Sequence, residues 1–352
     1  MRRSRLIAFK NLLLIMLLLA ISACTPKYVS LTKQGDTLLQ KGDKDGAQKR
    51  YEAAVKSSPK YAPALYRLGR LTADKGDWRL ADQYLTAAVV ADPQMPEAIR
   101  YKGEASLRLG RLEDAGRELR KSRELGAKGY ELSLGIYGYL SQDYELAYEA
   151  LTEAVQQDAQ VLAAVPYVLK AALASGALPP ALNALEKAKV PEKAADAALI
   201  HRVRVDLLYL SKDYGAALSA LSKAQEKAAF GFWFREPSQS LLNRLGAVRG
   251  AVVEYVHLGS PAARNGLLPG DIVTSFERKP IRSAAELNKQ LELYRKKPTH
   301  DEVLLEVFRD GQQMAFRLTP DAFQTRQLIE QTQEGREPTK LSQAPDGDLL
   351  FP

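Results

Sequence analysis

The chain has 352 residues, 46% hydrophobic and 26% charged, which is enough apolar content for more than one compact unit. Its formal net charge is +8, but four basic residues lie among the first 23, which leaves +4 on the remainder, with acidic and basic residues interleaved. Nucleic-acid binding needs clustered positive charge and is not indicated, and a single cysteine excludes internal disulfides.

Residues 1–23 predict a secretory signal peptide. A basic start is followed by an apolar run from Leu12 to Ile21, which is shorter than the about 20 apolar residues that a membrane-spanning helix needs. The run ends in Ile-Ser-Ala immediately before Cys24, and this segment resembles the lipobox of bacterial lipoproteins. The alternative is an ordinary secretory signal with an incidental cysteine.

The lipobox resemblance implies cleavage before Cys24, a diacylglycerol on its sulfur and acylation of the new amino group, with residues 24–27 as a lipidated linker. Buried acyl chains would hold the protein on a membrane. Thr25 follows Cys24. By the sorting rule of Gram-negative lipoproteins, a residue other than aspartate there implies the outer membrane, facing the periplasm.

A repeating register fills residues 28–228. Four glycines are each followed, twelve residues later, by an alanine and, four residues beyond that, by tyrosine or leucine; these glycines are Gly35, Gly69, Gly103 and Gly135. The alanines continue at spacings of 34, 34, 32, 34 and 36 residues, at Ala47, Ala81, Ala115, Ala147, Ala181 and Ala217. Self-similarity at this period indicates a repeat protein.

The register resembles the tetratricopeptide repeat, a helix-turn-helix of 34 residues, and predicts about six repeats that form an all-α solenoid. Glycine and alanine remove bulk so that paired helices approach closely, and the larger tyrosine or leucine fills the space. Further glycines fall between the two helices of a pair, where the chain must reverse: Gly42, Gly76, Gly110 and Gly176.

Function in such solenoids lies on the concave face, which the first helix of each pair lines. The register puts arginines and tyrosines of repeats two and three there: Tyr66, Arg67, Arg70, Arg100, Tyr101 and Arg108. Tyr139, Tyr167 and Tyr209 are expected to continue the face. We hypothesise that the arginines bind an acidic or extended peptide; a solvated helix face with scattered charges is the alternative.

Residues 229–320 change to strand and turn signals. Strands are predicted over 250–256, 271–277, 302–308 and 314–318, with Asp310-Gly311 as a hairpin turn. A capping box from Ser283 to Glu286 opens a helix that runs to about Tyr294. This order, and the run from Gly259 to Val273 above all, resembles the PDZ domain of HtrA-type envelope proteases, a small α+β fold.

The PDZ resemblance implies that a peptide adds as a strand between a sheet edge and a helix, with its terminal carboxylate on a glycine-containing loop. Ala229 stands where the family has the first glycine of that loop. The implied peptide-binding residues are Phe230, Gly231, Phe232, Trp233 and Phe234, opposite Ala284, Leu287 and Leu291. Phe230, Phe232 and Phe234 share one face by alternation; the alternative is that these residues belong to the core.

Catalytic or metal-binding patterns are not evident in the sequence, and no cofactor is predicted. None of the three histidines has a partner at metal-ligand spacing, and Ser260 lacks the surroundings of a nucleophile elbow. Residues 321–352 contain a short helical run and are otherwise expected to be mostly disordered.

The sequence therefore predicts a multidomain protein, an all-α tetratricopeptide solenoid followed by an α+β PDZ-like domain. We interpret it as a non-enzymatic, lipid-anchored envelope adaptor whose partners are proteins and peptides, including apolar C-termini, with no nucleic acid. Alternatives are a regulatory or substrate-delivery subunit of an envelope protease, an assembly factor of a secretion or cell-wall machine and, least favoured, a hydrolase.

Overall fold

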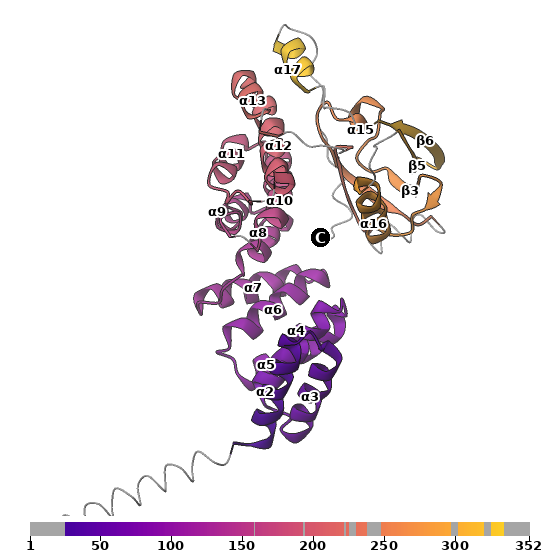
Figure 1. Cartoon of the computed structure of the whole chain (residues 1–352). Helices are drawn as coiled ribbons and strands as arrows, with labels where there is room; N and C mark the ends of the chain where they lie inside the picture. The colour runs from indigo at the N-terminus through magenta and orange to yellow at the C-terminus, as the bar shows by residue number, and fades with distance from the viewer. Residues whose placement is uncertain are drawn as a thin grey trace, which may run out of the picture. The chain divides into compact units, whose positions relative to one another are not determined.

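The computed structural model describes residues 25–157, 159–192, 194–221, 223–224, 230–237, 248–296, 302–319 and 325–333. Two compact units divide between Tyr130 and Glu131, within the repeat array (Figure 1). The second unit therefore contains both the later repeats and the sheet, although the type of secondary structure changes near residue 228. The signal segment and Cys24 lie outside the described residues.

The described part of the first unit, from residue 25 onward, contains three helix pairs. They are α2 (Lys27–Gln40) with α3 (Lys44–Ser57), α4 (Ala62–Asp74) with α5 (Trp78–Ala91), and α6 (Pro96–Arg108) with α7 (Leu112–Glu124). Aspartates start two of these helices, since the side chains of Asp43 and Asp77 accept hydrogen bonds from backbone N–H groups three residues ahead.

The glycines and alanines of the repeat register lie where the two helices of a pair pack against each other. A Cβ added to Gly69 would lie 2.6 Å from Cγ of Leu85, and one added to Gly103 would lie 2.8 Å from Cγ of Leu119. The register alanines are completely buried. Gly42 and Gly76 have φ of +84° and +83° between paired helices, where a side chain would be strained. The small residues therefore set how closely each pair of helices packs.

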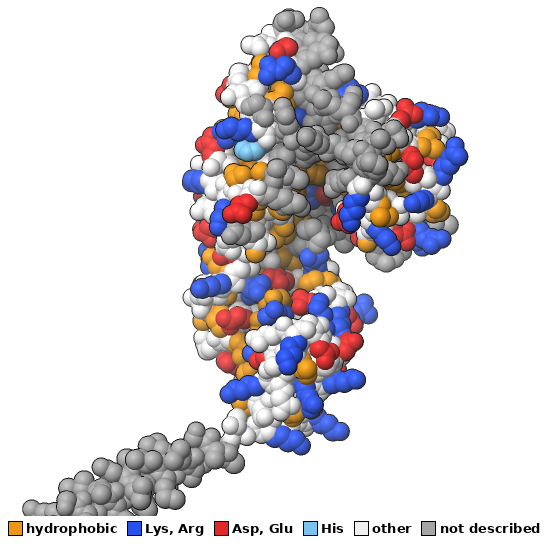
Figure 2. All heavy atoms as spheres, in the orientation of Figure 1, with side chains coloured by type: hydrophobic (Ala, Val, Ile, Leu, Met, Phe, Trp, Pro, Cys, Tyr) orange, Lys and Arg blue, Asp and Glu red, His pale blue; other side chains and the backbone are white. Residues whose placement is uncertain are grey.

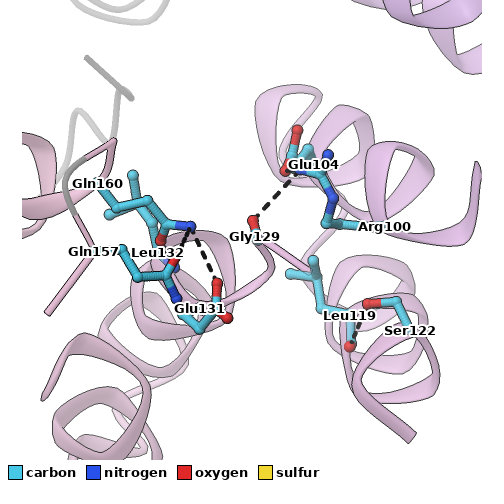
Figure 3. A network of polar contacts seen from close by, with 9 residues as sticks. All are labelled: Arg100, Glu104, Leu119, Ser122, Gly129, Glu131, Leu132, Gln157 and Gln160. Carbon is cyan, nitrogen blue, oxygen red and sulfur yellow. Dashed lines mark hydrogen bonds and ion pairs between the residues drawn. The ribbon is translucent and has the colours of Figure 1, made fainter. Parts of the chain in front are cut away.

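Three more helix pairs begin the second unit. They are α8 (Glu131–Leu140) with α9 (Tyr144–Ala154), α10 (Val161–Ser175) with α11 (Leu178–Glu186), and α12 (Ala194–Leu210) with α13 (Tyr214–Leu221). Gln160 fixes the start of α8: its Oε1 accepts from the N–H of Leu132 at 2.9 Å and its Nε2 donates to Glu131 at 3.0 Å (Figure 3). The described residues thus contain the six helix pairs that the register predicts.

An antiparallel sheet follows, with strand order β1-β2-β3-β5-β6. Its strands are β1 (Phe232–Arg235), β2 (Ala251–Val256), β3 (Ile272–Phe276), β5 (Val303–Arg309) and β6 (Gln312–Leu318), while the two-residue β4 (Lys279–Pro280) pairs with β3. The predicted hairpin is present, because Asp310 and Gly311 both have positive φ between β5 and β6.

Among the described residues, α15 (Pro261–Arg264) and α16 (Ala284–Arg295) accompany the sheet. Ser283 caps α16 by accepting from the N–H of Glu286 at 3.1 Å, as the capping box predicts. The buried face of α16 packs on one side of the sheet through Leu287, Leu291 and Tyr294, which form one core with Val253 and other strand residues.

The chain returns to the solenoid after the sheet. The predicted short helical run forms α17 (Thr325–Gln333), which packs against α13. Ile329 of α17 is completely buried in a cluster with Val205 and Leu208 of α12. A helix from beyond the sheet therefore covers the last repeat. None of the helices in the described part of the chain is long and apolar enough to span a membrane.

Candidate peptide-binding sites

Strand β1 forms one edge of the sheet, and no described strand pairs with its outer side. Its inner side pairs antiparallel with β2, where Phe232 lies opposite Val256. The carbonyl of Gly231 accepts a hydrogen bond from the His257 N–H at 2.8 Å. Backbone groups alternate in direction along a strand, so the N–H and C=O of Phe232 point to the open side.

Helix α16 contacts both ends of this segment. The ring of Phe230 lies 5.3 Å from that of Tyr294, near the end of the helix. At the other end, Oε1 of Glu236 accepts a hydrogen bond from the N–H of Ala285, in the first turn, at 3.2 Å. The segment 230–236 and α16 therefore run side by side in opposite directions.

The side chains predicted to face the bound peptide lie on the same side of the sheet. Phe232, Phe234 and Ala284 are partly buried and pack against the core that contains Leu287 and Leu291. The rings of Phe232 and Phe234 are 6.0 Å apart. The predicted wall residues are thus brought together, and the two leucines also serve the core.

The structure corrects the expectation for two aromatic residues. Phe230 does not project from a loop: it is 5% exposed and packs against Phe276 and Tyr294. Trp233 points to the opposite face of β1, where it packs against Tyr255. Alternation along the strand separates Trp233 from Phe232. Neither ring lines an open groove in this structure.

The predicted carboxylate-binding loop is described only from Phe230 onward, and Ala229 lies outside the described residues. Gly231 has φ of +78°, a conformation that side chains rarely adopt. The glycine is therefore required by the backbone at the point where the chain enters β1.

The first unit contains a pocket of about 500 Å³ in its first two repeats. It is lined by nine residues: Asp36, Leu39, Gln40, Tyr51, Tyr66, Arg67, Arg70, Leu71 and Asp74. Asp36 accepts hydrogen bonds from Arg67 and from the hydroxyl of Tyr51, so the charge of Arg67 is already paired within the chain. Burial, together with the neighbouring Asp36 carboxylate, raises the pKa of Tyr51.

Arg70 is the lining arginine for which the described residues show no ion pair. It lies beside Tyr66, whose pKa is raised, chiefly by burial. The Tyr66 ring lies 5.8 Å from that of Tyr101, and the Arg100 guanidinium lies 4.0 Å above the same Tyr101 ring. The predicted arginines and tyrosines of these repeats are therefore partly assembled, with Arg70 beside Tyr66 and attracted by the charge of Asp74, which lines the same pocket.

Two other predicted arginines are engaged within the first unit. Arg100 is ion-paired with Glu104 and donates to the Gly129 carbonyl at 3.4 Å (Figure 3). The Arg108 guanidinium lies 4.9 Å from the centre of the Trp78 ring. Basic and acidic side chains are interspersed on the face of this unit drawn in Figure 2.

The expected continuation of the face through Tyr139, Tyr167 and Tyr209 is wrong, because all three are at least 95% buried. Tyr139 and Tyr167 pack edge to face in a cluster that also contains Tyr255 of β2. The Tyr209 hydroxyl hydrogen-bonds with Thr332 of α17. The terminal helix thus contacts Tyr209, and the other two rings belong to a core that includes a residue of the sheet; such long-range contacts leave no trace in the repeat register.

A polar cluster joins α12 to β2 in the second unit. Asp206 accepts from the Tyr255 hydroxyl at 3.1 Å and lies 2.6 Å from Nδ1 of His257. Arg202, one turn earlier, donates to the carbonyl of Leu258. Burial and the Asp206 charge raise the pKa of Tyr255 well above its usual value. Sequence analysis missed Arg202 and Asp206; the available signal was two charges at core positions of a repeat helix.

A second ion-pair network joins α10 to the same strands. Glu254 of β2 lies 2.7 Å from Lys170 of α10 and 3.3 Å from Arg235 of β1. All three side chains are largely buried. The face of β1 and β2 that carries Arg235 and Glu254 therefore packs against the solenoid. The opposite face of β1 carries Phe232 and Phe234.

The His257–Asp206 pair has a hydrolase-like composition but lies in the core. His257 is 3% exposed, and the Oγ of the nearby Ser260 accepts from the N–H of Ala263 at the start of α15. Within the described residues, no three His, Cys, Asp or Glu side chains form a metal-binding group. Each of these side chains has a structural role here.

Comparisons with known proteins identify both modules. A family model described as a PDZ domain matches residues 221–319, and one described as a tetratricopeptide repeat matches 32–78 and 66–130. The mitochondrial serine protease HTRA2 of Drosophila persimilis is 33% identical over 90 residues, covering 26% of this chain and 19% of that protein; that of Drosophila pseudoobscura pseudoobscura gives the same values. The chain thus spans about a fifth of these relatives.

Solved structures of both kinds are similar over parts of the chain. A crystal structure of MamA is 26% identical, with a TM-score of 0.38, and covers 44% of this chain and 93% of that one. The HtrA3 PDZ domain bound to a phage-derived ligand, FGRWV, is 26% identical, with a TM-score of 0.23, and covers 27% of this chain and 85% of that one. The family models confirm the predicted fold class.

Proposed function

We propose that this chain, a tetratricopeptide solenoid followed by a small PDZ-like domain, is a non-enzymatic adaptor that binds the carboxyl-terminal segments of partner proteins at β1. Both kinds of module imply protein binding. The observation that carries the proposal is the outer side of β1, next to α16, with which no described strand pairs. A peptide strand there would gain backbone hydrogen bonds from Phe232 and apolar contacts from Phe234 and Ala284.

The pocket of the first unit is proposed as the second binding site. Arg70 offers a charge for a carboxylate, while Leu39 and Leu71 offer apolar contacts beside it. Because Tyr139, Tyr167 and Tyr209 are covered by the chain itself, partner binding by the solenoid is assigned to the first repeats. Two modest sites on one chain strengthen each other through effective concentration.

We further propose that Cys24 carries the lipid anchor and that the adaptor works at the envelope membrane, on the periplasmic side of the outer membrane. The support is the sequence pattern at Cys24. Labelling cells with a palmitate analogue should tag the wild-type chain and leave Cys24→Ser unlabelled. A wild-type chain without label would end the assignment.

Binding at β1 is tested with the full chain and an array of five-residue peptides that have free carboxyl termini and apolar last residues. Ala284→Arg places a long charged side chain at the partly buried wall position on α16, and we expect it to weaken binding by about tenfold or more, or about 1.4 kcal/mol. Ala285→Arg is the matched control, since its exposed side chain starts one residue further along α16.

Fluorescence anisotropy with the tightest array peptide gives both affinities, and the same peptide with an amidated carboxyl terminus tests the terminal charge. Equal affinity of the Ala284→Arg variant and the wild type would refute the groove assignment. A peptide that binds equally well as its amide would show that the terminal carboxylate is not recognised.

A further inference from the structure

Glu236 follows β1 directly and lies at one end of the proposed peptide groove, on which its role below rests. Its carboxylate reaches across from the strand to the first turn of α16, where it accepts the Ala285 N–H at 3.2 Å. Phe230 and Tyr294 make the contact at the opposite end. The Glu236 side chain therefore marks the end of the groove that is distant from the carboxylate-binding loop.

The position of Glu236 along β1 determines which peptide residue it meets. A peptide that runs antiparallel to β1 with its last residue beside Phe232 has its preceding residues beside Phe234 and then Glu236. Glu236 lies four positions after Phe232, a length of about 13 Å in an extended strand. The fifth residue from the carboxyl terminus is thus the one that lies at Glu236.

Two carboxylates, those of Glu236 and Glu286, lie at this end of the groove, beside the exposed Arg282. Glu236 is exposed, and Glu286 lies at the same helix start, where it accepts from the N–H of Arg282 at 2.7 Å. Neither carboxylate has an ion pair within the described residues. Arg235, the neighbouring cation, faces the other side of the strand, where it pairs with Glu254. An arriving basic side chain would therefore find two carboxylates that form no ion pair with any described residue.

We propose that Glu236 is a specificity-determining residue, which selects peptides with lysine or arginine at the fifth position from the carboxyl terminus and rejects those with an acidic residue there. A basic side chain lies against the carboxylate of Glu236. An acidic side chain at this position is repelled by the Glu236 carboxylate. It also cannot bind the N–H of Ala285, which already donates to Glu236. Recognition therefore extends beyond the residues that contact Phe232 and Phe234.

The test uses the peptide array with lysine, glutamine or glutamate at the fifth position and an acetylated amino terminus. The full wild-type chain should bind the lysine peptides about three- to fivefold more tightly than the glutamate peptides at low ionic strength, the size expected for an exposed ion pair. Glu236→Gln, which keeps the acceptor for Ala285, should abolish this preference. Glu236→Lys should reverse it.

The matched control is Glu292→Gln, which removes an equal charge from the exposed side of the same helix and should leave the preference unchanged. A purely structural Glu236 would change affinity for all three peptide classes equally, and that result would overturn the inference. So would a lysine preference that survives in Glu236→Gln. If no array peptide binds the wild-type chain, the groove assignment fails first, and this inference fails with it.

Discussion

At the scale of single residues, the register glycines determine how closely the repeat helices pack. Gly69→Ala would put a Cβ 2.6 Å from Cγ of Leu85 and 3.3 Å from its backbone nitrogen. These distances are too short, so the neighbouring helix would have to move away. We expect a loss of about 1–3 kcal/mol in the free energy of unfolding, measured by urea denaturation.

Gly215→Ala is the control for that substitution, because Gly215 lies in α13 without a close neighbour and with ordinary helical φ. Replacing it should raise stability by up to about 1 kcal/mol, since alanine restricts the unfolded chain. Equal effects of the two substitutions would show that the register glycines do not act through packing.

Tyr255 gives a prediction about pH. Burial and the Asp206 charge raise its pKa above the ordinary value of 10.0. The folded state therefore holds this proton more tightly than the unfolded state, so its contribution to stability is complete below about pH 10 and is lost as the pH rises further. Tyr255→Phe should weaken folding by about 2 kcal/mol at neutral pH, through loss of the hydrogen bond to Asp206.

Denaturation curves of the wild type and of Tyr255→Phe at pH 7 to 11 measure this effect. The stability difference between the two proteins should shrink above about pH 10, because the variant has no phenol to ionise at this place. A difference that stays constant across the alkaline range would contradict the assigned role of Tyr255.

At the scale of secondary-structure elements, α17 acts as the cap of the solenoid. Its Ile329 is completely buried against α12, although the helix comes from beyond the sheet. Ile329→Ala should cost about 2 kcal/mol or more. Glu330→Ala, at the exposed next position, should cost little. If the two variants melt at the same temperature by circular dichroism, α17 is not a structural cap.

The elements themselves could be predicted from local patterns. The spacing of Gly69 and Ala81 encodes a helix pair, because close packing needs small residues at those places. The strands around Val253 and Val273 and the capping box at Ser283 follow from alternation and turn chemistry. Each of these signals depends on residues that are close together in the sequence, so it can be recognised without knowledge of the tertiary structure.

The surroundings of individual side chains could not be predicted in the same way. Tyr167 and Tyr209 occupy the expected helix positions, yet Tyr167 is buried in a cluster that includes Tyr255, and Tyr209 is buried in one that includes Ile329 of α17. Trp233 is found on the solenoid side of β1 because Glu254 and His257 attach that face to the repeats. Such contacts form between segments that are far apart in the sequence, and a periodic pattern within one segment does not indicate which other segment will pack against it.

At the scale of the whole molecule, the later repeats and the PDZ-like domain are joined into one unit. Buried contacts join α12 to β2 through Asp206 and join α10 to β2 through Glu254. We expect Asp206→Ala to increase amide hydrogen exchange in both α12 and β2, because it leaves Tyr255 and His257 without their acceptor. Faster exchange confined to one of the two elements would show that they open independently.

The central claim is that the outer side of β1 receives a peptide strand. Hydrogen exchange of the full chain with and without the tightest array peptide measures this directly. Protection should rise over residues 231–236 and in α16, while β6, the other edge of the sheet, should stay unchanged. Protection at β6 or α2 without any change at β1 would contradict the claim.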